Sequence, residues 1–250
     1  MILSVNRLKF RYKSSPIIKD INFNVEKGEI LTILGRNGTG KTTLLKCLNN
    51  ILSPQCGTVY IDGIDTHTMH SVDIARKIGW VPQRSNMSRI KVYDLILLGR
   101  KPYFRWNPSK EDYKKVEEAI NIMGIKDISL HYIDELSGGE FQLVQIVRAL
   151  AQDPLAILLD EPTSSLDIRN QHLLMHKMKE IIHGSSRAAV ITMHDVNLAL
   201  RYSDKFLLLK DGSICAVGDK SIITPENILK VYDMEVRVVE VGGYPLVIPI

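Results

Sequence analysis

The chain has 250 residues, of which 45% are hydrophobic and 24% charged, and its formal net charge is +4. These values are ordinary for a soluble globular protein, and the length suits one domain with room for an inserted subdomain. No run of about 18 apolar residues could span a bilayer, and the first ten residues lack a signal-peptide core. Three cysteines without paired spacing argue against a disulfide framework or a zinc site. We therefore expect a cytoplasmic protein.

The start of the chain predicts short strands around a glycine-rich segment. Apolar patterning predicts strands over residues 5–12, 18–25, 29–34 and 58–62. A turn over residues 13–16 joins the first two strands, and an Asp-Gly turn ends the last. Over residues 43–48 apolar side chains return every three or four positions, which predicts a helix.

The glycine-rich segment between the third strand and this helix fits the pattern G-x-x-x-x-G-K-[ST] of a phosphate-binding P-loop. Glycines permit backbone conformations that a Cβ would block, and the loop N–H groups together with the helix N-terminus would surround a polyphosphate. Lys41 would reach the β- and γ-phosphates, and the Thr42 hydroxyl would ligate Mg²⁺. An ordinary glycine turn would not require the full pattern and both flanks. We expect nucleoside triphosphate to bind to Gly35, Arg36, Asn37, Gly38, Thr39, Gly40, Lys41, Thr42 and Thr43.

The rest of the chain alternates predicted helices with predicted strands. Residues 82–108 are expected to be irregular, basic and aromatic. Helices are predicted over 110–123, 140–152 and 169–183, and strands over 155–160, 188–192, 205–210 and 213–217. This order predicts an α/β fold with a mostly parallel core sheet, an antiparallel β portion and a helical subdomain inserted at about 84–152.

Two further segments carry chemistry. The apolar strand over 156–160 ends in Asp160 and Glu161, at the sheet edge where open α/β folds place ligands. Asp160 would hold the Mg²⁺ shell and Glu161 would polarise a water for attack on the γ-phosphate; the alternative is an acidic turn. Ser137 and Glu140 fit a helix-capping box, and Gly138 and Gly139 between them leave N–H groups open as a second phosphate-facing surface. A second such surface suggests a site shared between two chains.

These motifs resemble those of the ATP-binding-cassette (ABC) ATPases over essentially the whole chain. Leu136 to Glu140 is similar to the ABC signature, which is far more specific than a P-loop alone. The resemblance implies a P-loop NTPase fold of ABC type over residues 2–236, with a short C-terminal extension over 237–250. It also implies that two copies pack head to tail, so that Ser137, Gly138, Gly139 and Glu140 of one chain cover the ATP on the P-loop of the other.

The resemblance assigns further residues by their order. Tyr12 corresponds to the aromatic that stacks on adenine, although it could equally be a packed strand residue. Gln83 corresponds to the glutamine that links the Mg²⁺ site to a membrane subunit, Asp167 to the dimer-contact loop, and His194 to the switch histidine that contacts the γ-phosphate. Phe141 and Leu143 depart from the family, which has basic or polar residues there, and we expect them to make that helix's exposed face more apolar.

Two runs are similar to the ATPases of iron-siderophore, haem and vitamin B12 importers: Leu97 to Tyr103, and His194 to Asp204. They imply an ATPase subunit on the cytoplasmic face of the membrane, bound to permease subunits and served indirectly by a substrate-binding protein. We expect residues 83–106 to form part of the cleft for a permease helix, and their basic, aromatic character to reflect this rather than nucleic acid. The competing class is a soluble ABC ATPase, for example one serving iron–sulfur assembly.

Overall fold

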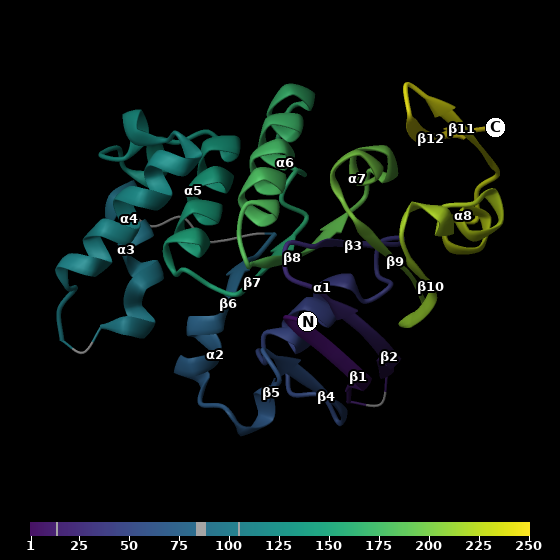
Figure 1. Ribbon diagram of the computed structural model, residues 1–250, viewed down its shortest axis with the longest axis horizontal. Helices are drawn as coiled ribbons and strands as arrows, with labels where there is room; N and C mark the ends of the chain where they lie inside the picture. The colour runs from purple at the N-terminus through teal and green to yellow at the C-terminus, as the bar shows by residue number, and fades with distance from the viewer. Residues whose placement is uncertain (14, 84–88, 105) are drawn as a thin grey trace.

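The computed structural model describes residues 1–13, 15–83, 89–104 and 106–250. Its centre is a six-stranded sheet in the order β10-β9-β3-β8-β7-β6 (Figure 1). All neighbours in this sheet are parallel except β10, which pairs antiparallel with β9. The strands are β3 (Ile30–Leu34), β6 (Ile78–Val81), β7 (Ala156–Asp160), β8 (Ala188–Met193), β9 (Lys205–Lys210) and β10 (Ser213–Gly218). The mostly parallel core sheet is confirmed.

A four-stranded antiparallel sheet in the order β2-β1-β4-β5 lies on one side of the central sheet (Figure 1). It consists of β1 (Leu3–Tyr12), β2 (Ser15–Val25), β4 (Cys56–Ile61) and β5 (Ile64–Asp65). Helix α1 (Lys41–Leu48) shares one hydrophobic cluster with both sheets through Leu44, Leu45 and Leu48. The helix that follows the P-loop is therefore fixed between two layers. Beyond β5, η1 (Thr66–Thr68) and α2 (Ser71–Lys77) lead into β6.

The two faces of the central sheet serve two cores, because successive strand residues point to opposite faces. In β7, Ala156 and Leu158 join the cluster around α1, whereas Ile157 and Leu159 join the cluster under the helices of the other face. Burial on both faces explains why these strands are continuous apolar runs. The helices over the second face include α6 (Ile168–His183) and α7 (Val196–Tyr202).

The inserted region is helical, as predicted, and it packs onto the second core. It contains α3 (Val92–Leu97), η2 (Leu98–Tyr103), α4 (Lys110–Met123), η3 (Lys126–Ile128), η4 (Ile133–Glu135) and α5 (Gly138–Ala151). The prediction that residues 82–108 are irregular was wrong for 92–103. Val92, Leu95 and Ile96 bury one face of α3, but a helix of six residues is too short for its periodicity to stand out.

Phe141 and Leu143 also differ from expectation. Phe141 is 7% exposed within the second core, and Leu143 packs partly buried against it. The predicted apolar surface on α5 is therefore wrong, because the helix turns these side chains inward.

The chain ends in a folded unit beside β9 and β10 (Figure 1). It contains η5 (Lys220–Ile222), α8 (Pro225–Tyr232) and a hairpin of β11 (Val236–Val241) and β12 (Tyr244–Pro249). The predicted C-terminal extension at 237–250 thus coincides with this hairpin. Among the helices in the described ranges, none combines the length and apolarity needed to cross a membrane.

Candidate functional site

A cavity of about 440 Å³ opens beside the P-loop, near the carboxyl ends of β3 and β7. This is the edge where parallel α/β sheets place their ligands. The cavity draws on segments far apart in sequence, and it is lined by Ile17, Asn37, Gly38, Gly40, Lys41, Thr42, Thr43, Gln83, Glu161 and His194. The P-loop and the three separate residues that were predicted to join it therefore meet around one space.

Lys41, the first residue of α1, is 5% exposed and lines this cavity. Its ammonium group donates hydrogen bonds to the Gly35 carbonyl at 2.8 Å and the Arg36 carbonyl at 3.1 Å. Burial lowers the pKa of Lys41, while the charges of Glu161 and Asp160 oppose that shift. A polyphosphate in the cavity would add negative charge beside a cation that has lost part of its hydration, which favours binding.

Two P-loop glycines are required by their surroundings. A Cβ at Gly35 would lie 2.3 Å from the backbone oxygen of Leu209, so β9 approaches the loop too closely for any side chain. Gly40 has φ of +104°, a conformation that L-residues rarely adopt, and a Cβ there would press on Ile18 at 3.1 Å. The loop shape is thus set by contacts with β9 and β2, and it presents its N–H groups at the start of α1.

Glu161 stands at the centre of a small polar network. Its carboxylate accepts a hydrogen bond from Gln83 Nε2 at 2.5 Å and lies 2.5 Å from His194 Nε2. The residue has φ of +50°, a left-handed conformation unusual for a side chain of this size. Such strain concentrates at functional sites, and here it turns the carboxylate from the end of β7 toward the cavity.

Thr192 is a member of this network that the sequence analysis missed. Its hydroxyl donates to Asp160 Oδ1 at 2.7 Å and accepts from the Glu161 N–H at 2.9 Å, so one side chain fixes both acidic positions. Thr192 is fully buried and lies opposite Asp160 in the β7–β8 register. The available signal was a hydroxyl residue inside an otherwise apolar strand.

We expect Thr192→Val to lower kcat for ATP hydrolysis about tenfold, with a smaller change in KM for ATP. The substitution keeps the shape but leaves the Asp160 carboxylate and the Glu161 N–H without this partner, at about 1–3 kcal/mol per buried group. Thr192→Ser retains the hydroxyl and should recover most of the rate. Steady-state kinetics with thermal unfolding of both variants measures the effect, and a Val variant with wild-type kcat would contradict this role.

The residues that could hold Mg²⁺ all offer oxygen ligands. Thr42 and Gln83 line the cavity, and Asp160, the last residue of β7, is 1% exposed. Hydroxyl, amide and carboxylate oxygens suit a hard cation, and Mg²⁺ commonly uses few protein ligands together with substrate phosphates. Among the described residues, no group of three or more His, Cys, Asp or Glu side chains could hold a metal ion by itself.

The remaining predicted residues lie outside the cavity lining. Ser137 caps α5 by accepting from the Glu140 N–H, while the Glu140 carboxylate accepts from the Ser137 N–H at 2.9 Å. A Cβ at Gly138 would meet nothing within 4 Å, so the backbone there is open on its outer side. Asp167 caps α6, and Tyr12 is 47% exposed at the end of β1 with its ring edge-on to Phe10. Tyr12 pairs with Ser15 in the β1–β2 register, and Ser15 lies two residues before Ile17 of the cavity lining.

Comparison with known proteins places this arrangement in a family. Residues 18–164 match the family profile described as ABC transporter. The chain belongs to the ABC transporter ATP-binding family. The chain is 47% identical over 250 residues to an uncharacterized ABC transporter ATP-binding protein of Methanocaldococcus jannaschii, covering all of this chain and 98% of that protein.

Other relatives of this ABC ATPase have named roles. It is 34% identical over 253 residues to a probable siderophore transport system ATP-binding protein of Bacillus subtilis, covering 99% of this chain and 92% of that one. It is 33% identical over 240 residues to a cobalamin import ATP-binding protein of Halobacterium salinarum, covering 95% of this chain but 60% of that longer protein.

Solved structures agree with the fold. The ABC ATPase aligns with a chain of a putative metal-chelate type ABC transporter in an inward-facing conformation, with a TM-score of 0.87, 30% identity, and coverage of 100% of this chain and 97% of that one. It also aligns with a dimeric ATP-binding cassette bound to ADP and Pi in a post-hydrolysis state, with a TM-score of 0.77, 28% identity, and coverage of 87% and 98%. The ABC ATPase fold and nucleotide binding as a family property are thereby confirmed.

Proposed function

We propose that this chain binds ATP with Mg²⁺ and hydrolyses it to drive import of a metal chelate through a membrane permease. The observation that carries the catalytic part is the single cavity shared by the P-loop, Gln83, Glu161 and His194. The importer class is supported by the names of the relatives. Siderophore, haem and cobalamin chelates are the candidate cargoes.

In this proposal each residue has a separate task. The P-loop N–H groups and Lys41 bind the phosphates, and Tyr12 stacks on adenine. Thr42, Asp160 and Gln83 would hold Mg²⁺, which offsets phosphate charge when bound. Glu161 accepts a proton from the attacking water, and His194 holds the Glu161 carboxylate and contacts the γ-phosphate.

The site requires a second copy. Ser137 caps α5 and its own N–H is bonded to Glu140, but Gly138 and Gly139 begin the helix, where N–H groups can bind an anion. None of these residues lines the cavity of its own chain. We infer that the partner chain's Ser137–Glu140 surface covers the ATP, with Asp167 at the contact between copies. The dimeric cassette bound to ADP and Pi supports this arrangement for a protein of the same fold.

A second cavity of about 400 Å³ suits the docking of a permease helix. It lies between the end of α1, α2, β6, η2 and α5, with Trp80 in its lining and the half-exposed side chains of Ile51 and Leu98 at its rim. Arg148 also lines it, and burial lowers the pKa of this guanidinium. Aromatic, Arg and aliphatic residues in one hollow are typical of interfaces. Of the predicted cleft at 83–106, η2 contributes directly, while residues 84–88 and 105 lie outside the described residues.

Site-specific crosslinking tests the importer assignment. A photoreactive residue at Leu98, which is 48% exposed beside this cavity, should crosslink to a co-expressed multi-span permease. The same probe at Ile122, which is 55% exposed on α4 away from the cavity, is the matched control and should not. Crosslinks only to soluble proteins would instead favour a soluble ABC ATPase, such as one serving iron–sulfur assembly, and would contradict binding to a permease.

A further inference from the structure

The side chain of one α7 residue, Asn197, forms two hydrogen bonds with the C-terminal hairpin. Asn197 donates from Nδ2 to the Val247 carbonyl at 3.1 Å, and the Val247 N–H donates to Asn197 Oδ1 at 2.8 Å. A side-chain amide thus bonds both polar groups of one β12 residue, as a neighbouring strand would. Val247 is 7% exposed but Asn197 is an exposed residue, so these two hydrogen bonds are partly buried.

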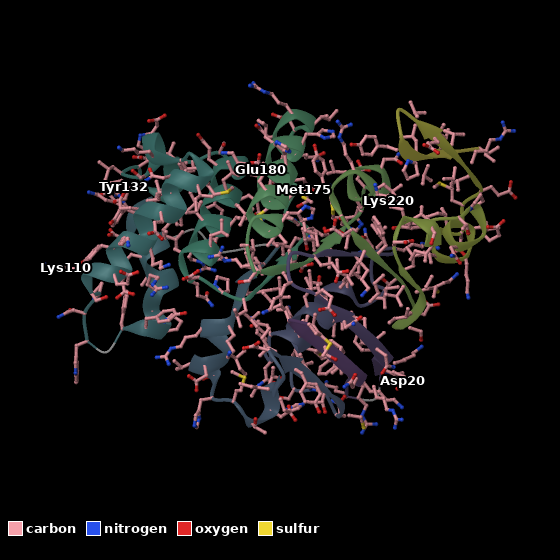
Figure 2. The ribbon with its side chains drawn as sticks, viewed as in Figure 1. Asp20, Lys110, Tyr132, Met175, Glu180 and Lys220 are labelled. Carbon is pink, nitrogen blue, oxygen red and sulfur yellow. The ribbon has the colours of Figure 1, made fainter. Side chains whose placement is uncertain are left out.

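A second contact lies one helical turn further along α7. The guanidinium carbon of Arg201 lies 5.4 Å from the centre of the Tyr244 ring, and the Lys220 ammonium lies 5.4 Å from the same centre. Lys220, labelled in Figure 2, belongs to η5, the first element of the C-terminal unit. Each such cation–π contact contributes about 0.5–1 kcal/mol at an exposed site. The hairpin is therefore held to α7 at two successive turns.

Helix α7 is coupled to the catalytic network by its position. His194 directly precedes Asp195, which caps α7 by accepting from the Leu198 N–H at 2.9 Å. Asn197 lies in the first turn of this helix, three residues after His194. Leu198, Ala199 and Leu200 bury the rest of α7 in the core, so the contact at Asn197 acts on the turn of the helix that lies next to His194.

The C-terminal unit touches the P-loop as well, but more weakly. Asp233, at the end of α8, forms an ion pair with Arg36, and the ammonium of Lys210 lowers the pKa of the Asp233 carboxyl, with Arg36 adding a smaller effect. More than half of both the Arg36 and Asp233 side chains is exposed. Exposed ion pairs contribute little, whereas the two part-buried hydrogen bonds of Asn197 join the hairpin to α7 directly.

We propose that Asn197 is a positioning residue for ATP hydrolysis, which uses the β11–β12 hairpin as a fixed support to hold α7 and so to aim His194 at Glu161. The hairpin thereby belongs to the catalytic unit. This inference depends on the assigned ATP hydrolysis but on neither the cargo nor the permease.

The test compares Asn197→Ala and Tyr244→Ala with Asn227→Ala as the matched control. Asn227 is also an amide that bonds a backbone carbonyl, that of Ile222 at 2.7 Å, but it links α8 to η5 rather than to α7. We expect Asn197→Ala to lower kcat about three- to tenfold, from two lost hydrogen bonds, with KM for ATP changed less than about twofold. Asn227→Ala should keep the wild-type kcat even where its thermal midpoint falls by a similar amount.

The double variant and measurements of ATP binding decide between positioning and general stability. Asn197→Ala with Tyr244→Ala should lower kcat by less than the product of the two single effects, because both release the same hairpin. ATP binding by all variants should stay near wild type, which separates this role from failure of the nucleotide site. A wild-type kcat for Asn197→Ala, or equal losses of kcat in Asn197→Ala and Asn227→Ala, would overturn the proposal.

Discussion

Glu161→Gln is expected to reduce ATP hydrolysis by about 10²–10⁴-fold, the usual effect of removing a well-placed general base. The amide keeps the size of the side chain but cannot accept a proton from water. It also places an NH₂ group against Gln83 or His194, where the carboxylate now accepts a hydrogen bond from one and pairs with the other. ATP binding should persist, because the Lys41 and P-loop contacts are unchanged.

The same variant should accumulate a dimer with trapped ATP, measured by size-exclusion chromatography with labelled nucleotide. Glu111→Gln, an exposed carboxylate in the first turn of α4, is the control for loss of one negative charge. Near-normal hydrolysis by Glu161→Gln would show that another group takes the proton.

Gly138→Asp is expected to abolish hydrolysis without destabilising the fold. A Cβ at Gly138 meets nothing within 4 Å, and a carboxylate at the first position of α5 favours the helix dipole. Against a γ-phosphate from a second chain, however, a like charge at about 4 Å costs about 4 kcal/mol at an effective dielectric of 20, which is roughly a thousandfold. The substitution should therefore impair hydrolysis at the site shared with the second chain and leave the fold of the single chain unchanged.

Gly138→Asn separates charge from bulk in this experiment, since it has the same shape without the charge. It should retain more activity than Gly138→Asp, and both should unfold thermally near the wild-type midpoint. Equal activity of wild type and Gly138→Asp would mean that this surface faces no phosphate.

The regular elements with strong local signals could be predicted from the sequence. The helix over 110–123 was predicted with its observed bounds, and it has a capping box between Ser109 and Asp112 and a left-handed Gly124 at its end. The strand over 205–210 was equally clear. By contrast, α3 buries only a few residues, and the sequence analysis does not predict the C-terminal hairpin although Gly242-Gly243 marks a two-residue turn.

At the site, motifs of consecutive residues could be predicted from the sequence, but contacts between residues on neighbouring strands and distant segments could not. The P-loop, Glu161 and His194 each carry a local pattern, and the structure brings them together around one cavity. Thr192 acts through the β7–β8 register, and Asn197 through a segment 50 residues further along the chain. Such partners depend on which strands become neighbours, which no local pattern specifies. The roles of Tyr12, Asp167 and the Ser137–Glu140 surface stay predictions.

The central claim is that each ATP site is completed by a second copy, and mixing two inactive variants tests it most directly. Lys41→Ala disables the P-loop and Gly138→Asp disables the covering surface, so a mixed dimer has one site with both parts intact. An equimolar mixture should recover roughly a quarter of the wild-type ATPase rate, because half of random dimers are mixed and each has one intact site of two. A mixture no more active than the two variants assayed separately would contradict the claim.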